Sequence, residues 1–211
     1  MNNVIWKTPG QTGTGTTYYF KAKYECAVRI LLAKLEVINA ELSIGLGRRV
    51  ISSTSGRVKT WESIQAKAVK KGYGKTDEKA LEHICDIAGV RAVCAFMDDV
   101  YLVANALKAH HDLRVIKVKD YLKYPKSSGY RSLHLIVELP VYYQGGAEWM
   151  RAEIQLRTSA MDFWANLDHQ LRYKRGKQEA VLIGEELKEY SAVVAGLDEK
   201  MMELRDRIAA I

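Results

Sequence analysis

Apolar residues recur with the period of an α-helix near both ends of the chain. Near the N-terminus they step by three or four residues from Phe20 to Leu42 and stop before Gly45. Near the C-terminus the same steps run from Ile183 to Ile211 and form an a/d heptad pattern. The two patterns predict long amphipathic helices. We expect these helices to pack on each other and on a sheet; the alternative is that the C-terminal pattern forms a contact between subunits.

The middle of the chain contains short apolar segments separated by polar turns. They predict four strands, over residues 89–97, 113–118, 133–139 and 149–156. Shorter helices are predicted over residues 59–71, 77–84, 100–110 and 158–171, and a polar connector over residues 52–56. Because strands and helices alternate irregularly, the predicted fold class is α+β, with a mixed β-sheet of four to five strands flanked by helices.

The chain divides into three parts. Residues 1–17 include a stretch rich in Gly and Thr and predict a flexible leader. Residues 18–176 form the predicted domain, which includes the N-terminal helix. Residues 177–211 form the C-terminal heptad helix, which packs on the domain or between subunits.

Composition narrows the class of protein. The 211 residues are 48% hydrophobic, which argues against general disorder, and carry a formal net charge of +7, which points to anionic partners such as nucleotides or RNA. The positive charge concentrates between Arg48 and Lys75, where Glu62 is the single acid. Three widely separated cysteines and the lack of a long apolar segment predict a cytoplasmic protein that neither enters nor crosses a membrane.

The loop Tyr124–His134 is the first candidate binding segment. It places Lys126, Arg131 and His134 around Tyr130, just before a predicted strand. An aromatic ring that stacks on a base and cations that bind phosphates suit a phosphorylated nucleotide. A solvated basic loop is the alternative.

Two acidic residues are candidates for a metal site. Asp86 precedes the first predicted strand and Glu153 lies in the fourth, so neighbouring strands would bring the two carboxylates together to hold Mg²⁺ and substrate phosphates. Taken singly, each also fits a turn residue or a solvent-facing strand residue. Five cations elsewhere in the sequence would supply charge for a polyphosphate: Arg57, Lys59, Lys67, Arg91 and Arg157.

Together these segments resemble a known family. In sequence order they are Ser-Gly-Arg-Val-Lys, Asp-Ile-Ala-Gly-Val-Arg, Lys-Ser-Ser-Gly-Tyr-Arg-Ser-Leu-His and Glu-Ile-Gln-Leu-Arg-Thr, followed by Met-Asp-Phe-Trp-Ala-Asn-Leu-Asp-His-Gln-Leu-Arg-Tyr-Lys. This series resembles the RelA/SpoT synthetase domain over residues 55–174. The layout is similar to single-domain small alarmone synthetases of the RelQ and RelP types.

The resemblance implies a nucleotidyltransferase-like fold and a reaction. The pyrophosphate of ATP would move to the ribose 3′-hydroxyl of GDP or GTP, which gives ppGpp or pppGpp and releases AMP. On the ATP side, Arg57 and Arg91 would sandwich the adenine, and the phosphates would be held by Lys59, Ser63 and Lys67. Asp86 and Glu153 would bind Mg²⁺, and Glu153 would also help to deprotonate the hydroxyl. Such chemistry depends on positioning and charge neutralisation.

The resemblance also implies an acceptor site. Tyr130 would stack on the guanine, and the acceptor site would comprise Lys126, Ser128, Tyr130, Arg131, His134, Gln155, Arg157 and Lys174. Many family members have Asn where this chain has Ser128. In RelQ-type tetramers a Phe of the allosteric alarmone cleft lies four residues before the first Arg, where this chain has Ser53. A homotetramer is implied, whereas regulation by bound pppGpp is not.

Two other functions stay open. Toxic relatives place pyrophosphate on the 3′ end of tRNA, and the basic region from Arg48 to Lys75 would suit an RNA backbone; an antitoxin would then be expected. A binding module could instead use the same cleft for nucleotide or single-stranded RNA without catalysis. Intact carboxylates at Asp86 and Glu153 argue for an enzyme.

Overall fold

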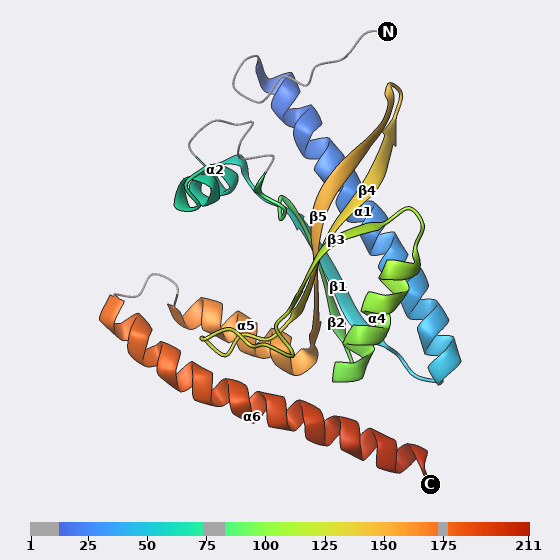
Figure 1. Cartoon of the computed structure of the whole chain (residues 1–211), viewed down its shortest axis with the longest axis vertical. Helices are drawn as coiled ribbons and strands as arrows, with labels where there is room; N and C mark the ends of the chain where they lie inside the picture. The colour runs from blue at the N-terminus through green and yellow to red at the C-terminus, as the bar shows by residue number, and fades with distance from the viewer. Residues whose placement is uncertain (1–12, 74–82, 173–176) are drawn as a thin grey trace.

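The chain is built around one sheet with helices on it and beyond its end (Figure 1). The computed structural model describes residues 13–73, 83–172 and 177–211. The helices are α1 (Gly13–Leu46), α2 (Trp61–Lys70), α4 (Met97–Ala109), α5 (Ser159–Arg172) and α6 (Lys177–Ala209). The strands are β1 (Ile51–Val58), β2 (Ala88–Cys94), β3 (Arg114–Asp120), β4 (Leu133–Tyr143) and β5 (Gly146–Thr158). Most of the helix predicted over residues 77–84 lies outside the described residues.

The five strands form one mixed sheet in the order β1-β2-β5-β4-β3. β2 and β5 are parallel, with Gly89 opposite Glu153, and the other neighbours are antiparallel. The predicted α+β class with a mixed sheet is therefore confirmed. The central parallel pair brings the start of β2 and the middle of β5, which are far apart in sequence, to the same level of the sheet.

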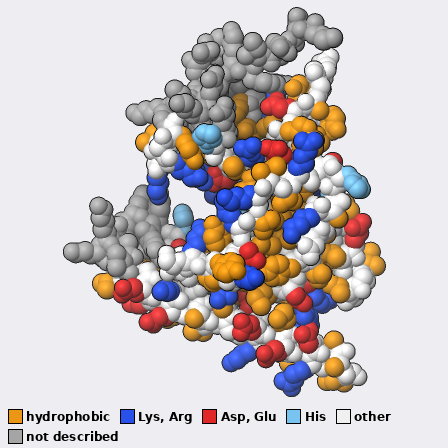
Figure 2. Space-filling view, viewed as in Figure 1, with side chains coloured by type: hydrophobic (Ala, Val, Ile, Leu, Met, Phe, Trp, Pro, Cys, Tyr) orange, Lys and Arg blue, Asp and Glu red, His pale blue; other side chains and the backbone are white. Residues whose placement is uncertain are grey.

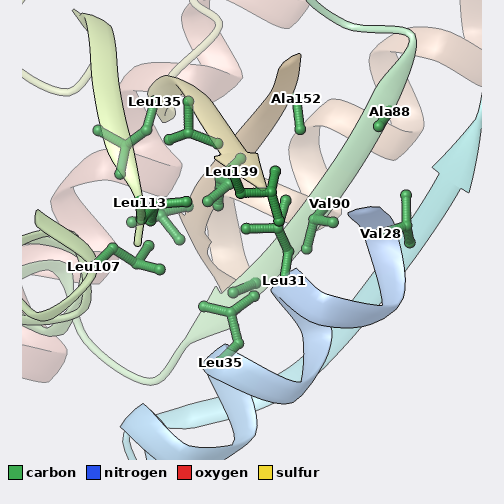
Figure 3. Packing of buried hydrophobic residues seen from close by; sticks show 14 of the residues in the cluster. Val28, Leu31, Leu35, Ala88, Val90, Leu107, Leu113, Leu135, Leu139 and Ala152 are labelled. Atoms are coloured by element: carbon green, nitrogen blue, oxygen red, sulfur yellow. The ribbon is translucent and has the colours of Figure 1, made fainter. Parts of the chain in front are cut away.

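Helices α1 and α4 cover one face of the sheet and form the core with it (Figure 3). The apolar stripe of α1 faces the sheet, and Leu31 and Leu35 are fully buried. Strand residues on that face are also buried, among them Val90 and Ile154. Since successive side chains of a strand point to opposite faces, residues 89, 91, 153 and 155 are directed to the other face.

The segment predicted as a polar connector, residues 52–56, is part of strand β1, so that prediction was wrong. β1 is an edge strand paired with β2 along its length, and most of its side chains are exposed, which explains its polar sequence. α1 covers its other side at Gly56, where an added Cβ would lie 2.4 Å from a side-chain carbon of Val28. This strand therefore forms because it pairs with β2 and packs closely on α1, and not because its side chains are hydrophobic.

Two element boundaries also differ from the prediction. α1 begins at Gly13, so residues 13–17 are helical and do not belong to a flexible leader. Adding residues to an existing helix costs much less than starting one, which lets weak helix formers join it. β4 continues through Pro140 to Tyr143. Because β3 pairs with β4 only as far as Glu138, the side of β4 next to Pro140 needs no hydrogen bond there.

Helix α6 packs on α5 and touches α4, while α1 packs on the sheet (Figure 1). The expected pairing of the two terminal helices was therefore wrong within the described residues. The apolar side chains of α1 are buried against the sheet and are not available to α6. α6 buries Leu187, Ser191, Ala195 and Asp198. Most residues of its heptad pattern are at least 43% exposed: Tyr190, Leu197, Met201, Leu204, Ile208 and Ile211.

Among the described residues, no helix has the length and apolar character needed to cross a bilayer.

Candidate functional site

A cavity of about 300 Å³ opens on the sheet face opposite α1. Strands β1, β2 and β5 supply most of its wall. In β5 the lining residues Glu153 and Gln155 alternate with Ile154, which points into the core. The lining residues are Ser55, Gly56, Arg57, Lys59, Asp86, Gly89, Val90, Arg91, Glu153 and Gln155. Two carboxylates and three cations from three separate parts of the chain thus face one space.

Asp86 lies at the mouth of β2, where two lysines bind the same carboxylate oxygen. The ammonium groups of Lys59 and Lys67 both donate to Oδ2 of Asp86. Burial raises the pKa of Asp86, but these two hydrogen bonds outweigh it and hold the pKa below its ordinary value. The other oxygen, Oδ1, is buried without a hydrogen-bond partner among the described residues. Asp86 is therefore ionised and has one free acceptor.

Glu153 is only 7% exposed and lies in the middle of the sheet. Its carboxylate accepts hydrogen bonds from Nδ1 of His134 at 3.2 Å and from Nε2 of Gln155 at 2.9 Å. Nζ of Lys119 lies 3.6 Å away. Burial raises the pKa of Glu153, but the hydrogen bond and charge of His134, then Gln155 and Lys119, bring it down to about 2.

The loop between β3 and β4 brings Tyr130 beside this network. The Tyr130 hydroxyl lies 2.8 Å from Nε2 of His134 and accepts a hydrogen bond from Nη2 of Arg157 at 2.6 Å. Nζ of Lys126 lies 4.5 Å from the centre of the Tyr130 ring. Tyr121 meets both Tyr130 and His134 edge-on, with ring centres 6.0 and 5.2 Å apart. The aromatic ring predicted to hold a base is thus surrounded by cations.

Asp162 of α5 joins the two sides of the site. Its Oδ1 accepts hydrogen bonds from Nη1 of Arg91 at 2.9 Å and from Nη1 of Arg157 at 3.2 Å. Its Oδ2 accepts from Asn166 at 3.1 Å, one helical turn further on. One carboxylate therefore orients an arginine that lines the cavity and an arginine that binds Tyr130.

The structure brings most of the predicted site residues together. Six of them line the cavity: Arg57, Lys59, Asp86, Arg91, Glu153 and Gln155. Five more reach those residues directly or through one or two neighbours: Lys67, Lys126, Tyr130, His134 and Arg157. Ser128 lies half-buried in the loop next to Gly129. Lys and Arg side chains also gather near the middle of the face shown in Figure 2.

Three predicted residues do not join this group. Ser63 is exposed on α2, where its backbone N–H and hydroxyl both contact Thr60 at the start of the helix. Arg131 acts electrostatically on Asp198 of α6, which places its charge on the helix side of the loop. Lys174 lies outside the described residues.

Three residues of the site were not predicted: Lys119, Tyr121 and Asp162. Each acts through a partner that is distant in sequence, so spacing alone carried no signal for it. For Asp162 a local signal existed, because it lies in the first turn of the helix that follows Arg157.

Comparisons with known proteins agree with this geometry. The family model described as "Region found in RelA / SpoT proteins" matches residues 56–178. GTP pyrophosphokinase YwaC of Bacillus subtilis is 45% identical, over 88% of this chain and 88% of its own length. GTP pyrophosphokinase YjbM of the same organism is 36% identical, over 90% of this chain and 88% of its own.

Solved structures give the same result. The crystal structure of small alarmone synthetase 2 from Bacillus subtilis has a TM-score of 0.77 at 45% identity and covers 88% of this chain and 97% of that one. Small alarmone synthetase 1 from the same organism, bound to its product pppGpp, has a TM-score of 0.81 at 35% identity and covers 91% and 97%. The chain therefore belongs to the RelA/SpoT family.

Proposed function

We propose that this chain is an ATP-dependent pyrophosphokinase that makes ppGpp from GDP and pppGpp from GTP. The observation that carries the proposal is the shared cavity, in which the carboxylates of Asp86 and Glu153 face Arg57, Lys59 and Arg91. Relatives that cover most of the chain are named GTP pyrophosphokinases, which supports this chemistry. The 3′-oxygen of the acceptor would bond to the β-phosphorus of ATP, and the bond from that phosphorus to AMP would break.

On the ATP side, Arg57 and Arg91 would hold the adenine and the lysines would hold the phosphates. In the structure, Lys59 and Lys67 both bind Asp86. Incoming phosphates offer these ammonium groups new anionic partners, and the exchange would free the Asp86 carboxylate for a metal. Ser63 would contribute through the start of α2, where it already contacts Thr60.

The residues present fit a magnesium ion. Asp86 Oδ1 is a buried carboxylate oxygen without a partner among the described residues, and Glu153 supplies a second carboxylate to the same cavity. Within the described ranges no cluster of three or more potential metal ligands occurs, which matches the habit of Mg²⁺ to use one or two carboxylates together with substrate phosphates. When bound, the ion would neutralise phosphate charge during transfer.

Glu153 would remain ionised throughout the physiological pH range, because its pKa is about 2. A carboxylate of such low pKa is a weak base, so its main contribution would be a hydrogen bond accepted from the attacking 3′-hydroxyl together with metal binding. His134 fixes the orientation of this carboxylate through the hydrogen bond from Nδ1.

On the acceptor side, Tyr130 would stack on the guanine while Lys126, Arg157 and Gln155 supply polar contacts. Lys126 and Arg157 lie 4.5 and 5.1 Å from the centre of the Tyr130 ring, and their charges would be available to the phosphates of a nucleotide bound there. Ser128, His134 and Lys174 would complete this side, and Arg131 would act from the helix side of the loop. Ser128, where many family members have Asn, would meet the guanine edge with a shorter side chain, and we propose both GDP and GTP as acceptors.

We further propose a cytoplasmic homo-oligomer, with a tetramer as the resemblance implies. The exposed apolar residues of α6, such as Leu197 and Ile208, support an additional contact on that helix. Light scattering of the purified protein would give its mass directly, and a monomer at micromolar concentration would contradict this part.

An acceptor panel tests the proposed activity. The protein is incubated with γ-labelled ATP and Mg²⁺ in the presence of GDP, GTP, deacylated tRNA or no acceptor, and the products are separated by thin-layer chromatography. Label in ppGpp and pppGpp is expected. Label in tRNA with none in guanosine nucleotides would favour the toxin-type reaction, and bound nucleotide without any labelled product would favour a binding module.

A further inference from the structure

Helix α6 touches the loop of the acceptor site directly before Tyr130. The hydroxyl of Ser191, on α6, donates a hydrogen bond to the backbone carbonyl of Gly129. Ser191 is only 6% exposed and Gly129 is buried. A helix near the C-terminus is thus bonded to the backbone of the residue that precedes the ring predicted to hold the guanine.

Gly129 and α6 are also in close van der Waals contact. Gly129 has a φ of 88°, and a Cβ added there would lie 2.7 Å from Cβ of Ser191 and 3.3 Å from Cα of Lys188. Only glycine fits both this backbone conformation and this distance to α6. The backbone of the loop at Gly129 therefore packs directly against Ser191 and the backbone of α6.

Two backbone hydrogen bonds within the loop connect Gly129 to Tyr130. The N–H of Gly129 donates to the carbonyl of Lys126 at 2.8 Å, and the N–H of Lys126 donates to the carbonyl of Tyr130 at 3.1 Å. Residues 126–130 thus form a closed turn whose one buried corner is Gly129. We expect the whole turn to become more mobile when the hydrogen bond from Ser191 is removed.

Helix α6 is itself fixed beside the site. Thr158, the last residue of β5, donates from Oγ1 to Oδ2 of Asp198 at 2.6 Å. The indole N–H of Trp164 donates to the carbonyl of Leu187 at 2.8 Å. Arg157, the neighbour of Thr158 in β5, binds the hydroxyl of Tyr130. The side chain of Tyr130 is therefore held by β5, while the backbone before it is held by α6, which is itself bonded to β5.

We propose that Ser191 is a positioning residue for the acceptor nucleotide: its hydrogen bond to Gly129 holds the turn 126–130 in the orientation in which Tyr130 receives the base. The proposal rests on the proposed function for the identity of the acceptor. The hydrogen bond of Ser191 goes to the loop, and Gly129 is not among the residues that line the cavity, so we expect its effect on acceptor binding and not on ATP binding.

The test compares Ser191→Ala with Ser43→Ala, which removes the serine hydroxyl of α1 that accepts a hydrogen bond from the N–H of Val50, away from the site. Ser191→Ala is expected to raise KM for GDP by ~3- to 10-fold, the range expected for one neutral hydrogen bond, with KM for ATP unchanged within about twofold. Ser43→Ala is expected to lower the melting temperature and leave KM for GDP unchanged. Gly129→Ala places a methyl group against Ser191 and so disturbs the same contact from the loop. It is expected to raise KM for GDP and leave KM for ATP unchanged, as Ser191→Ala does.

Hydrogen exchange of the peptide that spans residues 121–131 gives a readout independent of turnover. Exchange should be faster in Ser191→Ala than in wild type, with exchange in α2 unchanged, and slower again when GDP is added in excess. Equal changes in both KM values, or an unchanged KM for GDP together with unchanged exchange in the loop, would overturn the proposal. If wild type forms no guanosine product, the proposed function fails, while direct GDP binding and the exchange measurement still decide the role of Ser191.

Discussion

Nδ1 of His134 lies 3.2 Å from a carboxylate oxygen of Glu153, so one imidazole links the proposed acceptor site to the proposed metal site. Its other nitrogen lies 2.8 Å from the Tyr130 hydroxyl. In the proposed reaction, a base stacked on Tyr130 and the hydroxyl that donates a hydrogen bond to Glu153 would belong to the same nucleotide. The histidine would then fix the distance between the two groups that hold this nucleotide.

This relationship predicts graded effects of His134 variants. His134→Phe removes both hydrogen bonds, and since bonds to charged groups are the stronger ones, kcat/KM for GDP should fall ~10- to 100-fold. In His134→Asn the amide N–H₂ can take the place of Nδ1–H, so the loss should be smaller. Steady-state kinetics of both variants test this, and equal losses would contradict the separate role of the bond to Glu153.

Glu153→Gln removes the charge at nearly constant shape. Turnover should fall on the order of 10²-fold or more, because charge at the reacting atoms is lost. Binding of ATP should persist, since Arg57 and Arg91 remain in the cavity. Isothermal titration with a non-hydrolysable ATP analogue measures the second property, and activity within a few-fold of wild type would refute the assignment.

The depressed pKa of Glu153 predicts an acid-dependent stability. The folded-state pKa is about 2, whereas the ordinary value is 4.5. A carboxyl group with a lowered folded pKa stabilises the protein fully above its unfolded pKa and loses this contribution as the pH falls toward the folded value. Urea unfolding between about pH 5 and pH 3 should therefore show a shallower loss of stability for Glu153→Gln than for wild type. A steeper loss of stability with falling pH in Glu153→Gln than in wild type would contradict this prediction.

Asp162→Asn tests the carboxylate that Arg91 and Arg157 share. Because Arg91 is proposed to hold ATP and Arg157 to hold the acceptor, KM for ATP and KM for GDP should both rise, by about 3- to 30-fold each. Asn166→Ala removes only the bond to the other oxygen of Asp162 and serves as the matched control with a small effect. A change in one KM alone would show that Asp162 does not join the two sides.

Periodicity in the sequence was enough to predict the long helices and four of the five strands. The residues of β5 illustrate why the site could also be anticipated: Glu153, Gln155 and Arg157 alternate with Ile154 and Leu156, so polar and apolar residues separate onto two faces. Strand β1 escaped detection because an exposed edge strand needs no apolar pattern, only a neighbour to pair with.

The heptad pattern of α6 predicted the helix and misjudged its buried side. Ser191, Ala195 and Asp198 face the domain because small and polar residues allow a close approach to Gly129 and Thr158, while Leu197 and Ile208 stay exposed. Asp162 was missed for a related reason. Its partners come from strands β2 and β5, and their meeting point depends on the parallel pairing of those strands.

The most direct test of the proposed activity is the stoichiometry of its products. Wild-type protein with equal amounts of ATP and GDP and excess Mg²⁺ is followed by ³¹P NMR, with Glu153→Gln as the control. The proposed reaction requires AMP and ppGpp to appear in equal amounts, with a new diphosphate resonance from the 3′ position, and neither to appear with the variant. AMP or ADP formed without ppGpp, or ppGpp formed equally well by Glu153→Gln, would contradict it.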